Sequence, residues 1–141
     1  MENDPPQNKP YDFIMYPESD AGQYSHRDCT VNFYTRVGAL LDPSMTMLNI
    51  GAGRGANILE EYSPYRRKVQ TFKGRVSKLI GIDVDPVVME NPELDEAYIV
   101  APKDIYPLAD NSIDIIVSDH VLEHVEFPLE FATELHRVLK P

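Results

Sequence analysis

The sequence predicts an α/β fold in which helices cover a mainly parallel, doubly wound sheet. Three observations support this prediction. Four short apolar runs alternate with segments whose apolar residues recur at helical spacing. The first run leads directly into a glycine-rich turn, and the second run ends in an aspartate. Strands that end in such polar or glycine-rich loops are typical of parallel sheets whose carboxyl edge binds a ligand.

The predicted elements follow one another with short connections. Residues 1–24 are polar and rich in Pro and Asn, which predicts a flexible N-terminal segment ahead of one domain over residues 25–141. The apolar runs predict strands over 45–50, 79–83, 97–100 and 113–118. Helices are predicted over 28–41, over 56–62 with a continuation into the next residues left open, and from Pro128 onward, with an inner face of Leu129, Ala132, Leu135 and Leu139.

Composition narrows the classes of protein. A chain of 141 residues is long enough for one domain with a buried core. Its formal net charge of −10 disfavours nonspecific binding to nucleic acid or anionic membrane. Cys29 is the only cysteine, and no apolar run approaches the ~18 residues of a membrane span. We therefore expect a cytoplasmic protein with no nucleic acid or membrane partner.

The positive charge is concentrated in one stretch. Six of the 13 basic residues fall between positions 66 and 78 with no acid among them: Arg66, Arg67, Lys68, Lys73, Arg75 and Lys78. Two interpretations remain open. A solvated connector between elements is favoured over a docking surface for an acidic partner.

The glycine-rich turn Gly51-x-Gly53-x-Gly55 stands between a predicted strand and a predicted helix. Glycines let the backbone turn tightly and approach a ligand closely, and the helix N-terminus offers free N–H groups. With Ala56 the turn also fits the dinucleotide-binding fingerprint. The alternative is an ordinary tight turn without a ligand.

Asp83 ends the second predicted strand, where a carboxylate can accept hydrogen bonds from both hydroxyls of a ribose. It follows Gly55 by 28 residues, more than the ~20 usual in dinucleotide folds, and the basic stretch accounts for the excess. The alternative role for Asp83 is to cap a helix ahead of Pro86. Together with the glycine turn, Asp83 indicates nucleoside binding.

Several segments in order resemble one family. Met47–Gly55 is similar to the first motif of class I S-adenosylmethionine-dependent methyltransferases, and Leu79–Pro86 is similar to the second. Tyr106–Val117 resembles the segment leading into strand four, Val121–Val125 the helix start after it, and His136–Pro141 the helix end before strand five. The resemblance covers about residues 46–141 and is to the small-molecule branch called methyltransferase type 11.

The resemblance implies S-adenosylmethionine as the cofactor, a small molecule as the methyl acceptor, and a Rossmann-like sheet truncated after about four strands. It also implies a set of cofactor-binding positions. Gly51, Ala52 and Gly53 would pack on the methionine portion, Asp83 would hold the ribose, Val84 would flank the adenine, Asp104 or Ile105 would border its edge, and Ser118 would reach the cofactor from the end of strand four.

Two positions depart from the family pattern. Asn49 stands where the family usually has an acid that contacts the amino end of the cofactor, and an amide accepts a hydrogen bond but carries no charge. The acid usual after strand three falls near Pro102 here, so Asp104 is a displaced candidate.

Asp119 and His120 follow strand four and are the candidate catalytic residues, since a histidine near neutrality can take a proton from an acceptor. The alternative is a helix-capping Asp119 and a structural His120. His120-x-x-Glu123-His124 also matches an inverted zinc-peptidase motif. We expect no metal site, because the motif follows a buried strand and the needed third ligand is missing.

Other functions stay open beside methyl transfer. A noncatalytic cofactor-binding module would share every motif, and an NAD(P)-dependent oxidoreductase fragment would share the glycine turn and Asp83. Family members continue after Pro141 into a fifth strand beside strand four. We therefore expect a fragment with little turnover of its own, whose strand over residues 113–118 is an exposed edge prone to self-association.

Overall fold

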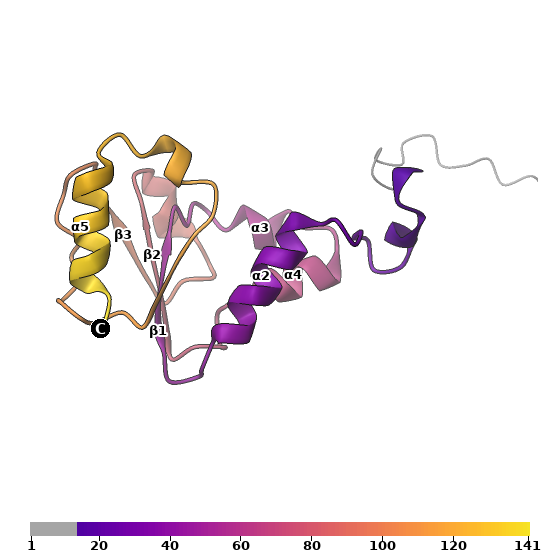
Figure 1. The fold of residues 1–141 in the computed structure, drawn as a ribbon, viewed down its shortest axis with the longest axis horizontal. Coiled ribbons are helices and arrows are strands. Elements are labelled where there is room, and N and C mark those ends of the chain that lie inside the picture. Colours follow the sequence, from indigo (N-terminus) through magenta and orange to yellow (C-terminus); the bar gives the residue numbers. More distant parts are fainter. Residues whose placement is uncertain (1–13) are drawn as a thin grey trace, which may run out of the picture.

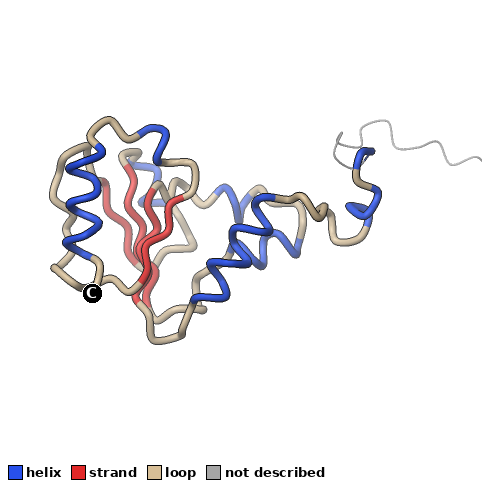
Figure 2. Tube along the Cα trace, in the orientation of Figure 1, coloured by secondary structure: helices blue, strands red, loops and turns tan. Residues whose placement is uncertain are grey.

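The computed structural model describes residues 14–141, and residues 1–13 of the predicted N-terminal segment lie outside the described part. A four-stranded parallel sheet forms the centre, in the order β3-β2-β1-β4. Helices α2 to α4 lie on one side of this sheet and α5 lies on the other (Figures 1 and 2). The predicted α/β fold with a doubly wound parallel sheet is therefore confirmed.

The strands form where the apolar runs predicted them. They are β1 (Thr46–Ile50), β2 (Lys78–Asp83), β3 (Glu96–Ile99) and β4 (Ile115–Ser118). The α-helices are α2 (Cys29–Leu40), α3 (Ala56–Leu59), α4 (Pro64–Gln70) and α5 (Pro128–Val138), and short 3-10 helices are η1 (Pro17–Asp20), η2 (Pro86–Glu90) and η3 (Leu122–His124). None of the helices over residues 14–141 has the length and apolarity to cross a membrane.

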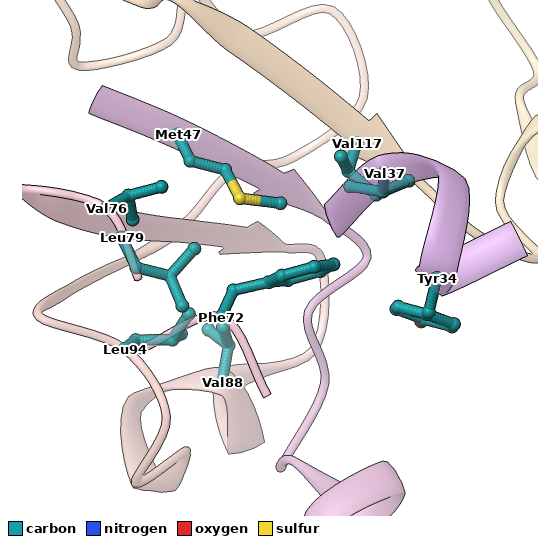
Figure 3. Close-up of a cluster of buried hydrophobic side chains, with 9 residues drawn as sticks. All are labelled: Tyr34, Val37, Met47, Phe72, Val76, Leu79, Val88, Leu94 and Val117. Carbon is teal, nitrogen blue, oxygen red and sulfur yellow. The ribbon is translucent and has the colours of Figure 1, made fainter. Parts of the chain in front are cut away.

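Each face of the sheet buries its own apolar cluster, because successive side chains of a strand point to opposite faces. Met47 of β1 belongs to the cluster beneath α2, which Figure 3 shows with Tyr34, Phe72 and Val117 around it. Leu48 and Ile50 point to the opposite face, where they pack with α5.

The helix predicted over 56–62 is wrong in its extent, because the chain forms two helices there. Ser63 is fully buried, and its hydroxyl accepts a hydrogen bond from Arg66 N–H at 3.3 Å, which begins α4 with Pro64 at its first position. The same hydroxyl donates to the Gly22 carbonyl at 2.9 Å. The sequence Ser-Pro was the signal for this second helix start.

The inner face predicted for α5 is also wrong in part. Leu129 is 77% exposed, whereas Phe131, Leu135 and Val138 pack on the sheet. The orientation follows Phe131, Leu135 and Val138, which recur at helical spacing. Arg137 adds hydrogen bonds from its guanidinium to the carbonyl oxygens of Tyr106 and Leu108 beside the sheet. Those bonds fix the helix face that carries positions 134 and 137 toward the segment between β3 and β4.

The favoured interpretation of the basic stretch as a solvated connector holds in part: Arg67, Lys68 and Lys73 are exposed, but several of the cations also bind other elements. Arg66 pairs with Asp28 and Glu61, whose side chains are both 8% exposed. Lys73 donates to two carbonyl oxygens after η2, Arg75 binds the Gly38 carbonyl of α2, and Lys78 pairs with Glu96 of β3 at 2.6 Å. These cations connect α2, α4 and the strands around them.

The edge at β4 is partly covered. Ile113 makes an isolated parallel bridge with Leu139, and Lys140 N–H donates to the Ile113 carbonyl at 2.9 Å. Beyond this bridge, Ile115–Ser118 pairs with β1 alone within residues 14–141. Self-association through this edge stays a prediction.

Candidate functional site

The glycine turn leaves the sheet at the carboxyl end of β1 with three left-handed residues: φ is 69° at Gly51, 49° at Gly53 and 80° at Gly55. The requirement for glycine is strictest at position 51. A Cβ there would lie 2.3 Å from Val121 Cγ2, so the turn passes directly beneath the residues that follow β4. The glycine turn and the loop after β4 are therefore in contact at the carboxyl edge of the sheet.

Asp83 connects the end of β2 to this turn. Gly53 N–H donates to Asp83 Oδ2 at 2.8 Å, and Asp85 N–H donates to Asp83 Oδ1 at 2.9 Å. Each carboxylate oxygen thus has one backbone donor and keeps a lone pair for a ligand. The alternative role of Asp83 as a helix cap is wrong, because Asp85 caps η2 by accepting from Val87 N–H at 2.9 Å.

A cavity of about 500 Å³ opens at the carboxyl ends of the strands. Its walls come from the ends of β1 and β2, from the segment after β3, from the loop after β4 and from the first turns of α5. Five predicted site residues line it: Gly51, Asp83, Val84, Asp104 and His120. Sequence reasoning missed the aromatic wall of Tyr106, Phe127 and Phe131, whose positions depend on how α5 packs.

The other predicted cofactor residues do not line the cavity. Ala52 and Gly53 form the turn behind Gly51, and Asn49 lies half-buried on the face of β1 that carries Met47. Ile105 is 76% exposed beside the cavity. Ser118 ends β4 opposite Ile50, and within the described chain its buried Oγ has no hydrogen-bond partner.

Asp119 and His120 differ in their surroundings. Asp119 Oδ2 accepts a hydrogen bond from the Tyr34 hydroxyl at 3.1 Å, which connects the end of β4 to α2. Burial, together with the Asp119 carboxylate, raises the pKa of Tyr34 well above its usual range. Asp119 is absent from the cavity lining, whereas His120 belongs to it.

His120 has a left-handed backbone with φ of 55°, and its side chain is 87% exposed. Its ring nitrogens lie 3.7 Å from Asp119 Oδ1 and 3.6 Å from Glu123 Oε1, distances longer than a hydrogen bond. A non-glycine residue in this conformation is uncommon, and such residues concentrate at functional sites. The imidazole is therefore close to two carboxylates and free to turn toward a ligand.

The zinc-peptidase spacing falls on a loop and a 3-10 turn instead of an α-helix. Glu123 and His124 belong to η3, and His120 precedes it. An α-helix is what would bring positions 120 and 124 to one face. Over residues 14–141, no three His, Cys, Asp or Glu side chains form a group that could hold a metal ion.

The comparisons with known proteins decide the family. The model of a methyltransferase domain matches residues 48–141, which is more than half of the chain. This chain belongs to the methyltransferase family. An uncharacterized methyltransferase of Mycobacteroides abscessus is 31% identical over 104 residues, covering 68% of this chain and 36% of that relative. This methyltransferase chain therefore spans just over a third of the length of a curated relative that it matches.

Solved structures agree on the fold. A SAM-dependent methyltransferase from Aquifex aeolicus aligns with a TM-score of 0.55 and 25% identity, over 79% of this chain and 58% of that chain. A putative S-adenosyl-L-methionine-dependent methyltransferase from Methanococcus maripaludis aligns with a TM-score of 0.58 and 19% identity, over 99% and 63%. The class I methyltransferase fold is thereby established for this chain.

Proposed function

We propose that this chain binds S-adenosylmethionine at the carboxyl edge of its sheet, as part of an enzyme that methylates a small molecule. One observation carries the proposal: Gly53 N–H holds Asp83 Oδ2 at 2.8 Å beside the cavity. This bond brings the glycine turn and the ribose-binding acid together before any ligand arrives.

The residues around the cavity fit the cofactor. Ser118 Oγ does not line the cavity in the free protein, but it is a buried polar atom without a partner among residues 14–141, so a cofactor that reached the end of β4 would satisfy it. A Cβ at position 53 would meet no atom within 4 Å, which leaves room beside the turn. Asp83 would hold the ribose hydroxyls, and Val84, 64% exposed at the cavity, would cover one face of the adenine.

The residues after β4 would act on the acceptor. When bound, S-adenosylmethionine supplies a methyl group attached to a sulfonium, whose thioether product is a good leaving group. The protein then contributes mainly position and orientation. His120 lines the cavity, and its imidazole would accept the proton of the acceptor's attacking atom. Asp119 would keep its hydrogen bond to Tyr34 and a negative charge beside the imidazolium.

A second candidate is a cofactor-binding module without catalysis. The absence of Asp119 from the cavity lining and the high exposure of His120 favour it, because neither side chain is yet fixed against a reacting atom. Methyl transfer from labelled S-adenosylmethionine, with pooled small metabolites as acceptors, separates the two candidates. A chain that binds the cofactor and transfers no label would support the module.

Calorimetry tests the binding proposal. S-adenosylhomocysteine, the demethylated product, should bind with a one-to-one stoichiometry, and NAD should give no heat of binding under the same conditions. NAD binding in place of S-adenosylhomocysteine would replace the proposal with the oxidoreductase alternative. If neither S-adenosylhomocysteine nor NAD binds, the proposed function is also contradicted.

A further inference from the structure

We propose that Asn91 is a positioning residue that fixes the glycine turn in its cofactor-binding conformation; this inference rests on the proposed function. Asn91 follows η2 and is 9% exposed. It lies outside the lining of the cavity, on the far side of the turn. Its effect on a bound cofactor therefore has to pass through the backbone of the turn.

The carboxamide of Asn91 is fully engaged. Nδ2 donates to the carbonyl oxygens of Ala52 at 2.9 Å and Gly53 at 3.1 Å, and Oδ1 accepts from Glu93 N–H at 2.9 Å. These three partners also fix which side-chain atom is nitrogen, because the two carbonyls accept only from a donor and the Glu93 amide needs an acceptor. The amide therefore binds two consecutive peptide groups of the turn at once.

One of these peptides is held from both sides. The Ala52 carbonyl and the Gly53 N–H belong to the same planar trans peptide, so they point in opposite directions. Asn91 binds the carbonyl at 2.9 Å, and Asp83 Oδ2 accepts from the N–H at 2.8 Å. A rotation of this peptide would break both bonds. Asn91 thereby keeps the N–H directed at the acid proposed to bind the ribose.

The third glycine of the turn is explained by the same contact. A Cβ at position 55 would lie 2.7 Å from Asn91 Oδ1 and 3.4 Å from Pro92 Cδ. Gly55 therefore accommodates the carboxamide as well as a φ of 80°. The spacing Gly-x-Gly-x-Gly and the distant Asn91 form one structural unit.

An isosteric substitution tests this role. Asn91→Asp replaces the donating NH₂ by an oxygen, which repels the two carbonyl oxygens when the carboxyl is ionised. Protonation turns that oxygen into an O–H donor again, which restores one of the two bonds and removes the repulsion. Burial and the carbonyls raise the pKa of such a carboxyl, so the working protonated form is present at low pH and is lost as pH rises. The affinity of the variant should therefore depend on pH in a way that a merely structural defect does not.

The measurement is calorimetric titration of S-adenosylhomocysteine into the 141-residue chain between about pH 5 and pH 8. At about pH 8, Asn91→Asp should bind at least about tenfold more weakly than the natural chain. At about pH 5, its affinity should be within about threefold of that of the natural chain. The ratio of the two dissociation constants at each pH cancels any contribution from the neighbouring groups Glu93, Lys73 and Asp83, which both proteins share. Asn32→Asp, an exposed substitution on α2 with the same charge change, should follow the natural chain throughout.

The outcomes separate the two proposals. If folded Asn91→Asp binds S-adenosylhomocysteine as tightly as the natural chain at high pH, the positioning role alone is overturned. The same follows if its affinity is lost at high pH and does not recover at low pH. No binding by the natural chain overturns the proposed function and this inference together. If Asn91→Asp does not fold at high pH, Asn91→Ala decides: the inference requires about tenfold weaker binding at every pH, and equal affinity contradicts it.

Discussion

The two loops that meet at the carboxyl edge of the sheet differ in how the protein holds them. The glycine turn after β1 is fixed by internal hydrogen bonds to Asp83 and Asn91. The loop after β4 begins with Asp119, which Tyr34 binds, and continues with a left-handed His120 whose side chain is 87% exposed. We infer that the glycine turn forms a cofactor side that is already ordered, whereas the loop after β4 forms an acceptor side that becomes ordered when a ligand binds.

The largest expected effect is at Gly51, where the two loops touch. Gly51→Ala would place a methyl group 2.3 Å from Val121 Cγ2 at a φ of 69°, which should lower the free energy of unfolding by about 2–4 kcal/mol. Urea denaturation measures the loss. Adding Val121→Ala should recover the steric part in a double-mutant cycle, and strict additivity would show that the loops are independent.

The next effect concerns Asp83. Asp83→Ala removes the acceptor for Gly53 N–H and the proposed ribose contact, so binding of S-adenosylhomocysteine should weaken by about 1.5–3 kcal/mol. Asp83→Asn should lose less, since its amide oxygen can still accept from Gly53. Calorimetry on both variants provides the comparison. If a folded Asp83→Ala protein kept its affinity for S-adenosylhomocysteine, the assignment of Asp83 as the ribose contact would be wrong.

The parts predicted from the sequence are those set by local pattern and by parallel topology. Short apolar runs predicted the strands, and parallel pairing of β1 with β2 had to bring Asp83 close to the glycine turn. Asn91 and Tyr34 could not be predicted this way. Asn91 is a single polar residue in a turn, and Tyr34 binds Asp119 across 85 positions of sequence. The orientation of α5 escaped prediction because the helix carries two overlapping apolar patterns, and Phe131, Leu135 and Val138 face the sheet where the face beginning at Leu129 was expected.

Tyr34 gives a smaller effect that probes the acceptor side. Tyr34→Phe removes the hydrogen bond to Asp119 and should lower the free energy of unfolding by about 1–2 kcal/mol. Affinity for S-adenosylhomocysteine should stay within about twofold, because Asp119 does not line the cavity, while methyl transfer should fall. Tyr65→Phe, which keeps the stacking on Tyr24, is the control. A large loss of cofactor affinity would place Asp119 on the cofactor side.

The smallest effect on stability is expected at His120. Glycine adopts a φ of 55° without the cost that a side chain carries, so His120→Gly should leave unfolding unchanged or raise its free energy by about 0.5 kcal/mol. Methyl transfer should nevertheless fall, because the proton acceptor is gone. A destabilised variant with full activity would show that His120 is structural.

Backbone amide NMR tests whether S-adenosylmethionine binds at this edge of the sheet. On titration with S-adenosylhomocysteine, we expect the largest shifts at Gly51–Gly55, at Asp83 and Val84, and at 118–121, with those of α2 nearly unchanged. The Gly53 amide should already exchange slowly without ligand, because Asp83 holds it. Shifts confined to α2 and α4, or no shifts at saturating ligand, would show that the cofactor does not bind at this edge.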